Sequence, residues 1–195
     1  MYSPGVAVNR PGRDATIPGA MGMQWTKLKK QVEQRFAPSV AGRVELRTTS
    51  YRHAHDSAGR GWITVDKREV HNFCTLKYCV EHSILASDIR EANSATDWRD
   101  PDQRAGYYEG GDQADAILEK RGVVTQSWYE DSLQDFLSLS IEDALRSENF
   151  LHRALGMLDA RLGKRRLRAL ELGPEEHPLV RRFLALRQEA EHVGP

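Results

Sequence analysis

The sequence lacks the features that would place the protein in a membrane or in an oxidising compartment. No apolar run approaches the roughly 20 residues that a transmembrane helix needs, and the N-terminus lacks the charged-then-apolar order of a signal peptide. Only two cysteines are present, Cys74 and Cys79. They are too few for a disulfide framework, and their spacing is not that of a zinc knuckle. We therefore expect a reduced, cytoplasmic protein with no membrane contact.

The short motifs that identify common enzymes are also missing. The chain contains no G-x-x-x-x-G-K-[ST] phosphate loop, no G-x-G-x-x-G after a strand, no H-E-x-x-H and no G-x-S-x-G. Each of these motifs carries a specific chemistry, such as cradling a phosphate or holding zinc. Their absence removes the strongest sequence evidence for catalysis. It does not exclude catalysis, because active sites are assembled in space.

What the sequence does contain is the composition of an ordinary globular protein. It has 195 residues, of which 39% are hydrophobic and 29% are charged, and that length suits one domain with a real core. Residues 1–22 hold three prolines and four glycines, so they cannot bury enough apolar surface to offset their ordering entropy. We expect 1–22 to be a disordered tail and 23–195 to be a single domain, with Met23 as an alternative start.

Hydrophobic periodicity predicts an α+β fold. Apolar residues recur at i, i+3, i+7 and i+11 from Trp25 to Phe36, which is typical of one face of a helix. Apolar and charged residues alternate from Arg43 onward, which is typical of a half-buried strand. The predicted strands span residues 43–50, 62–65 and 69–76, and the predicted helices span 24–36, 78–93, 112–122, 127–139, 140–163 and 178–191. Residues 94–111 are predicted to be a loop.

These elements assemble most simply into an N-terminal helix, a small three-stranded antiparallel sheet, and a C-terminal helical half. Short turns between the predicted strands favour a meander. A sheet that small needs helices over one face to be stable. We therefore predict that residues 23–78 form the helix and sheet, and that 79–195 are mainly helical and pack on the sheet.

Four segments together resemble a family of small bacterial proteins of unknown function. They read "WTKLKKQVEQRF", "YRHAHDSAGRGWITVD", "NFCTLKY" and "SENFLHRALGMLDARLGKRRL", and the resemblance covers residues 23 to about 190. The chain departs from the family pattern at Lys67, where the family has Gly, and at Phe150, where it has Pro. The resemblance implies a bacterial protein. It implies no activity, cofactor or site residue.

The stretch "YRHAHD" is the most suggestive piece of chemistry. If the first strand continues through Tyr51, His53 and His55 point to one face, and two histidines at i and i+2 can reach one metal ion. Asp56 and His71 are the further candidate ligands, with Asp66 next. The site would be a divalent-metal centre of a hydrolase or nuclease. The alternatives are a non-metal acid–base role for His55 and Asp56, and a polar loop in which Asp56 makes an Asx-type turn.

The charge is unevenly spread although the net charge is zero. Residues 24–78 carry a net charge of +6, residues 79–152 carry −10, and residues 153–195 carry +3. The densest basic cluster is Lys164, Arg165, Arg166 and Arg168. Such a cluster can contact nucleic-acid phosphates irrespective of sequence. The alternative is that basic and acidic parts neutralise each other.

The sequence thus leaves two functional hypotheses of different class. The leading one is a non-enzymatic binding module without a cofactor, whose partner is a protein or a nucleic acid. In that hypothesis the last helices pack beside the first one, and the cluster around Lys164 joins Lys27, Lys29 and Lys30 in one basic face. The competing one is the metal-dependent enzyme, which needs His53, His55, Asp56 and His71 to converge.

Overall fold

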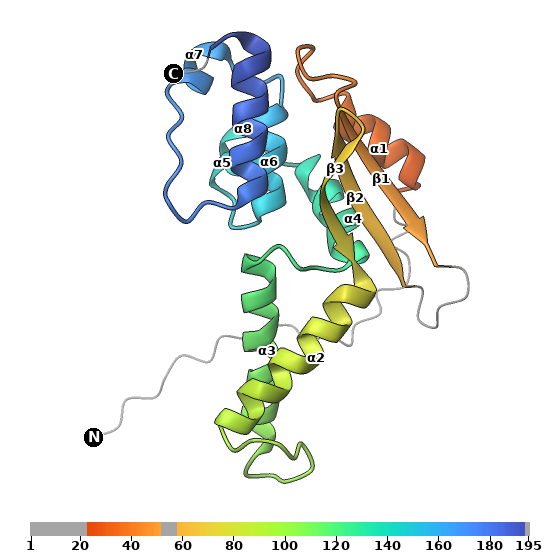
Figure 1. Ribbon diagram of the computed structural model, residues 1–195, viewed down its shortest axis with the longest axis vertical. Coiled ribbons are helices and arrows are strands. Elements are labelled where there is room, and N and C mark those ends of the chain that lie inside the picture. Colours follow the sequence, from red (N-terminus) through yellow and green to blue (C-terminus); the bar gives the residue numbers. More distant parts are fainter. Residues whose placement is uncertain (1–22, 52–57, 194–195) are drawn as a thin grey trace.

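The computed structural model describes residues 23–51 and 58–193 of the chain. The predicted tail, residues 1–22, lies outside the described residues. The elements follow one another in this order (Figure 1): α1 Trp25–Glu33, β1 Val44–Ser50, β2 Gly59–Val65, β3 Arg68–Cys74, α2 Thr75–Ala92, α3 Arg104–Lys120, α4 Gln126–Phe136, α5 Ile141–Arg146, α6 Phe150–Leu158, α7 Lys164–Arg168 and α8 Pro178–Glu191. In this described part, no helix is long and apolar enough to cross a membrane.

The predicted α+β architecture is confirmed. The three strands form an antiparallel sheet in the order β1–β2–β3, and α1 and α4 pack against it. The period-2 pattern explains the two faces, since Leu46, Ile63 and Phe73 point into the core and are fully buried. The opposite face is charged and carries the ion pair between Arg60 and Glu69. The helices α5 to α8 pack together as a helical layer. This layer contacts the sheet side of the molecule through the packing of α6 on α4.

The turn between β2 and β3 uses two residues in the left-handed region. Asp66 has a φ of 48° and Lys67 a φ of 66°, as a two-residue hairpin turn of the primed type requires. The Asp66 carboxylate accepts hydrogen bonds from Arg43 Nε and Nη2 at 3.0 and 2.8 Å. The hairpin is therefore as tight as one with glycine, and a lysine adopts the conformation for which glycine is best suited.

The helix α4 lies close to β2 because β2 has glycines on the covered face. A Cβ atom at Gly61 would stand 2.3 Å from Tyr129 Cδ1, and one at Gly59 would overlap the Gln126 side chain. The absence of these side chains lets the Tyr129 ring stack on Phe73 with centroids 4.3 Å apart. The "GRGW" segment is thus a packing surface for α4 as well as a strand.

The predicted loop 94–111 is wrong over its second half, because α3 begins at Arg104. This half of the segment contains Gly106, Gly110 and Gly111, and glycine lowers the propensity of a segment to form a helix. Gly110 is instead buried against α2, where an added Cβ would stand 2.9 Å from Arg90 Cγ. Glycine here allows two helices to approach closely. In a single sequence, a glycine with this role cannot be distinguished from a glycine in a turn. The helices α2 and α3 form an antiparallel hairpin that projects away from the body (Figure 1).

The predicted helix 140–163 is interrupted. Ser140 caps α5 as expected from the sequence, but the chain leaves the helix after Arg146. Asn149 then caps a new helix, α6, by accepting hydrogen bonds from Leu151 N and His152 N. Gly163, predicted to end this helix, is instead the N-cap of α7. Thr125 caps α4, which begins at Gln126, one residue before the predicted helix 127–139.

The first and last thirds of the chain are joined through the end of α6. Ala37 N donates to Leu158 O at 2.8 Å, and Ala160 N donates to Arg35 O at 2.8 Å. The buried Arg187 guanidinium lies beside this contact and donates to Leu158 O and Asp159 O at 3.0 and 3.1 Å. The end of α6 therefore has its free carbonyls satisfied by a side chain from α8.

We expect Gly61→Ala to destabilise the protein by about 1–3 kcal/mol, the usual cost of overpacking a tight core. The Tyr129 ring that the new methyl group would meet is fully buried and cannot move aside. Urea denaturation followed by tryptophan fluorescence measures the effect. Gly173→Ala is the matched control, because nothing lies within 4 Å of the added Cβ. Equal midpoints for the two variants would contradict the packing role of Gly61.

Candidate functional site

The candidate metal ligands are only partly within the structure. His53, His55 and Asp56 lie outside the described residues. His71 is described, and its Nε2 lies 3.1 Å from Gly122 O. Across residues 23–51 and 58–193, no group of three or more His, Cys, Asp or Glu side chains could hold a metal ion. The metal hypothesis therefore stays a prediction that rests on residues 52–57.

The two predicted basic clusters lie on different elements. The helix α7 packs beside α8, whereas α1 packs against the sheet (Figure 1). Two of the four cations of the α7 cluster are already in ion pairs, since Lys164 pairs with Glu191 and Arg166 with Glu142. Arg165 and Arg168 are exposed. On α1, Lys29 pairs with Glu33, while Lys27 and Lys30 are exposed. A phosphate contact at either cluster remains a prediction.

The side chains around His71 form an aromatic cluster that the sequence analysis did not identify. Phe150 stacks on His177 with centroids 4.0 Å apart and on Trp128 with centroids 5.2 Å apart. The His71 ring meets Phe150 and His177 edge-on at 5.6 and 5.4 Å. These rings come from β3, α4, α6 and the N-terminus of α8. The cluster is the point at which the sheet and the helical body meet.

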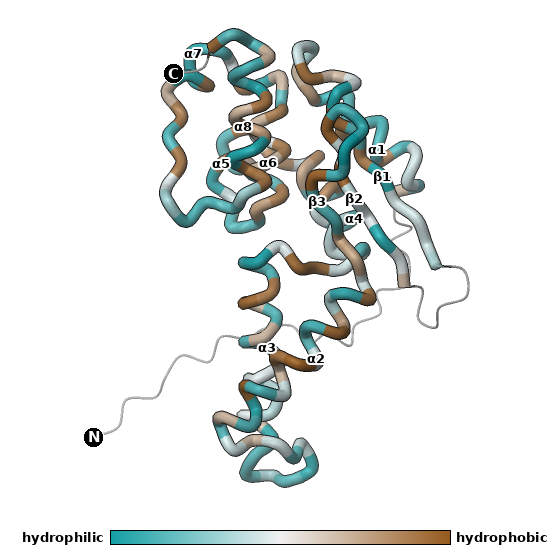
Figure 2. Tube along the Cα trace, viewed as in Figure 1, coloured by the Kyte–Doolittle hydropathy of each residue, from teal (hydrophilic) through white to brown (hydrophobic). Residues whose placement is uncertain are grey.

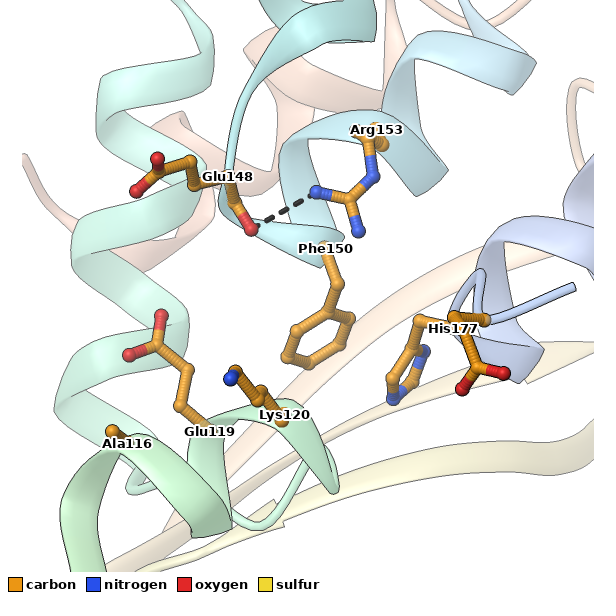
Figure 3. Close-up of a pocket in the computed structure, with 8 residues that line it drawn as sticks. Ala116, Glu119, Lys120, Glu148, Phe150, Arg153 and His177 are labelled. Atoms are coloured by element: carbon orange, nitrogen blue, oxygen red, sulfur yellow. Dashed lines mark hydrogen bonds between the residues drawn. The ribbon is translucent and has the colours of Figure 1, made fainter. Parts of the chain in front are cut away.

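A cavity of about 630 Å³ opens beside this cluster. Figure 3 shows Phe150 and His177 at its base, with Glu119 and Lys120 of α3 on one side and Arg153 above. Phe150 and His177 are buried, whereas Glu119, Lys120, Glu148 and Glu175 are exposed at the rim. The cavity therefore has a buried aromatic base and a charged rim, the combination typical of a small-ligand site.

The Arg153 guanidinium is neutralised by an ion pair within the protein. Its Nη2 and Nε donate to the Glu176 carboxylate at 2.8 and 3.1 Å, and its Nη1 donates to Glu148 O at 2.9 Å (Figure 3). This arrangement ties the start of α6 to the segment before α8. Among the described residues, by contrast, no ion pair involves Glu119, Glu148, Glu175 or Lys120.

His177 is neutral in the folded protein and its tautomer is set by a helix cap. Its Nδ1 accepts a hydrogen bond from Leu179 N at 3.1 Å, so the ring proton lies on Nε2. Burial, and next the neighbouring His71, lower the pKa of His177 to about 4. Burial also lowers the pKa of His71. His177 therefore carries a neutral Nε2–H at physiological pH, and this atom lies beside Gly122, where an added Cβ would stand 2.5 Å from it.

A sequence signal existed for one of these residues. His177 stands immediately before Pro178, and proline in the first turn marks the residue before it as a helix cap. No local pattern pointed to Glu119 and Lys120 of α3 or to Phe150 of α6. Their proximity comes from tertiary packing alone.

One comparison with known proteins gave a match. The model of the SF0329 protein family matches residues 24–188 of the chain. No curated protein and no solved structure matched.

We expect the free energy of unfolding to fall as the pH drops from about 6.5 towards 4. A histidine whose pKa is lower when folded binds a proton preferentially in the unfolded state, so its stabilisation is complete above pH 6.5 and is lost through the folded pKa. His71 and His177 contribute in this window, with His152, whose pKa burial also lowers. The pKa of Glu191, lowered to about 2 mainly by hydrogen bonds from Lys164 and Ser39, adds a further loss only below about 4.5.

The variant His177→Asn isolates one contribution, because asparagine keeps the cap acceptor and does not titrate. Urea titrations at several pH values should give a flatter pH dependence for this variant than for the wild type. Val180→Ala, a core change in the same helix, should lower stability and leave the slope unchanged. A slope for His177→Asn identical to that of the wild type would contradict the assignment.

Proposed function

The chain belongs to the SF0329 protein family, and we propose that it is a non-enzymatic binding module of the bacterial cytoplasm whose α2–α3 hairpin docks onto a protein partner. The description of the family names no activity, so the proposal rests on geometry. We call residues 75–121 the arm, since they contain α2, α3 and the loop between them. The rest of the described chain is the body.

The observation that carries the proposal is the location of the exposed apolar side chains. Of all the described residues, five large hydrophobic side chains are 45% to 60% exposed, and every one is on the arm: Leu76, Val80, Ile84, Trp98 and Tyr108. In α2, an 18-residue helix, only Ala86 is buried. Figure 2 shows hydrophobic positions along this projecting helix. Single exposed hydrophobics are normal, but a concentration on one projecting element marks an interaction surface.

The three α2 side chains form one stripe. Leu76, Val80 and Ile84 follow at i, i+4 and i+8, so they lie on the same helix face. Ser83 and Ser87 lie next to the stripe and are also exposed. Other side chains of α2 contact α3, since Arg90 Nε donates to Tyr107 O at 2.9 Å and His82 lies against Asp115. The stripe therefore stays exposed when α2 packs on α3. Helices that dock into a groove of a partner protein present an apolar face of this kind.

Charge indicates what kind of partner fits. The arm has ten acidic and six basic residues, a net charge of −4. A second copy of the arm would bring the same sign to the interface, and nucleic acid would do the same with its phosphates. Three aliphatic side chains also offer too little area for a stable dimer on their own. A partner protein with an apolar groove bordered by lysine or arginine meets both requirements.

Nucleic-acid contact by α7 is the weaker proposal, favoured by the exposure of Arg165 and Arg168. Fluorescence anisotropy of labelled duplex DNA and single-stranded RNA across a salt series tests it. Binding that weakens steeply with salt and is lost in Arg165→Glu/Arg168→Glu would support it. No binding at low salt would end it.

The test of the docking arm is site-specific photocrosslinking in the bacterial cytoplasm. A photoreactive amino acid at Val80 or Ile84 should crosslink one basic protein partner, and the same group at Arg165 should not. Reconstituted binding to that purified partner should weaken about 30-fold or more in Ile84→Asp, the effect of losing a central interface side chain. It should also weaken as salt rises.

Gln113→Asp is the matched control, because it adds the same charge to an exposed position of α3 away from the stripe. This variant should bind like the wild type. The proposal fails if both arm positions crosslink nothing, only a second copy of this chain or only nucleic acid. It fails equally if the two variants lose affinity alike.

A further inference from the structure

We propose that the free edge of β3 binds an extended, acidic segment of another protein, which adds to the sheet as a further strand. This site lies outside the apolar stripe of the arm and does not depend on the docking proposal. The strand β3 is an end strand of the sheet, and Figure 1 shows it at the margin from which the chain continues into α2. The main chain of this edge determines what can bind there.

The pairing of β1 with β2 shows which way the main-chain groups of β2 point. At one end of the pair, Tyr51 N donates to Ala58 O at 2.9 Å. At the other end, Asp66 N donates to Arg43 O at 2.8 Å. Main-chain groups alternate in direction along an antiparallel strand. The even-numbered residues of β2 therefore direct their N–H and C=O groups to β1, and the odd-numbered residues bond to β3.

This alternation identifies the unpaired groups of β3. Asn72 stands opposite Trp62 and Glu69 opposite Thr64. Since both β2 partners bond to β1, the N–H and C=O groups of Asn72 and Glu69 point to the free edge. A bulge in β3 adds one residue between these two positions, which is why both point outward although they are three residues apart. Among the hydrogen bonds of the described residues, none satisfies these outward groups.

The opposite edge of the sheet is partly satisfied by the protein itself. The outward N–H of Leu46 on β1 donates to Glu33 Oε1 of α1 at 2.9 Å, and Val44 forms a bridge with Ala41. The edge of β3 has no such substitute in the described part of the chain, although Asn72 is half-buried. Main-chain groups that lose water without gaining a partner are costly. Another extended chain is what pairs with a strand edge of this kind.

Space for an added chain exists beside this edge. A depression of about 350 Å³ is lined by Glu69, Val70, His71, Asn72, Lys77 and residues 121–123. Val70 and Val123 are half-buried in its wall. Because side chains alternate between the two faces of a strand, every second side chain of an added strand can pack against these valines. The depression therefore favours a segment with apolar residues at alternate positions.

The charges near the edge favour an acidic segment. Arg68 and Arg121 are exposed, and neither belongs to an ion pair among the described residues. Glu69, the acidic residue of this edge, is already paired with Arg60. A carboxylate on the added strand can therefore approach a free arginine. A second copy of β3 would instead bring the same cations to the seam, and like charges on neighbouring strands are destabilising.

Peptide selection followed by an N-methyl scan tests the inference. A displayed library of short, unconstrained peptides is selected on the immobilised full chain, and the strongest binder is synthesised as the probe. It should carry acidic residues and alternate apolar ones. Methylating one amide of the probe at a time should weaken binding about tenfold or more at every second position. The amides between should tolerate methylation, because only alternate residues of an added strand bond to the edge.

Variants of the protein locate the site. Asn72→Pro removes the outward N–H and leaves the bonds between β2 and β3 in place, since proline is tolerated on edge strands. It should weaken probe binding about tenfold or more, whereas Asn72→Thr keeps the N–H and should bind like the wild type. Arg121→Glu should also weaken binding. Lys120→Glu makes the same charge change next to the depression but outside its lining, and should not.

The inference is overturned if no peptide is selected, if the N-methyl scan shows no two-residue period, or if each variant and its control lose affinity alike. It is also overturned if sedimentation detects a dimer that Asn72→Pro abolishes, because a second copy would then occupy the edge. Circular dichroism checks folding, and the N-methyl scan decides even if Asn72→Pro does not fold. Ile84→Asp should leave probe binding unchanged, so the edge and the docking arm can fail separately.

Discussion

The buried guanidinium of Arg187 is the interaction on which the assembly of the body depends. It donates to three main-chain carbonyls at the end of α6, those of Leu158, Asp159 and Leu162, and to the Glu191 carboxylate. Glu191 in turn accepts from Ser39 and pairs with Lys164, so the loop after α1 and the start of α7 join the same network. Burying such a group is expensive unless all its donors are used. The network therefore specifies one arrangement of α1, α6, α7 and α8.

The same network positions the cavity, although it lies at the opposite end of α8. Arg187 anchors the C-terminal half of α8 to α6, while His177 caps its N-terminus ten residues earlier, about 15 Å away along the axis. The Arg153–Glu176 pair then joins the start of α6 to the segment before α8. With both ends held, Phe150 and His177 have little freedom to separate. A site built on two clamped helices is more rigid than one built on loops.

Local periodicity predicted the α+β fold, because burial in strands and amphipathic helices repeats at short range. It failed where a residue type has two physical uses, as with Gly110, which marks close packing of α2 on α3 and not a turn. It also failed where a cap interrupts a helix, as at Asn149. The candidate cavity could not be predicted, because Glu119, Phe150 and His177 lie on separate elements and share no spacing. His177 beside Pro178 was the one local signal, and it indicates a helix cap and not a ligand site.

The uneven charge of the sequence becomes informative once the internal pairs are removed. Arg166 meets Glu142 and Arg153 meets Glu176 within the body, so part of the basic C-terminal segment is neutralised by the fold, as one reading of the sequence suggested. Among the described residues, the ion pairs of the arm are internal to it, and its acidic excess lies beside its exposed apolar stripe. An unpaired charge next to an apolar surface restricts which partner can bind there. The partner must cover the apolar side chains and also carry charge of the opposite sign.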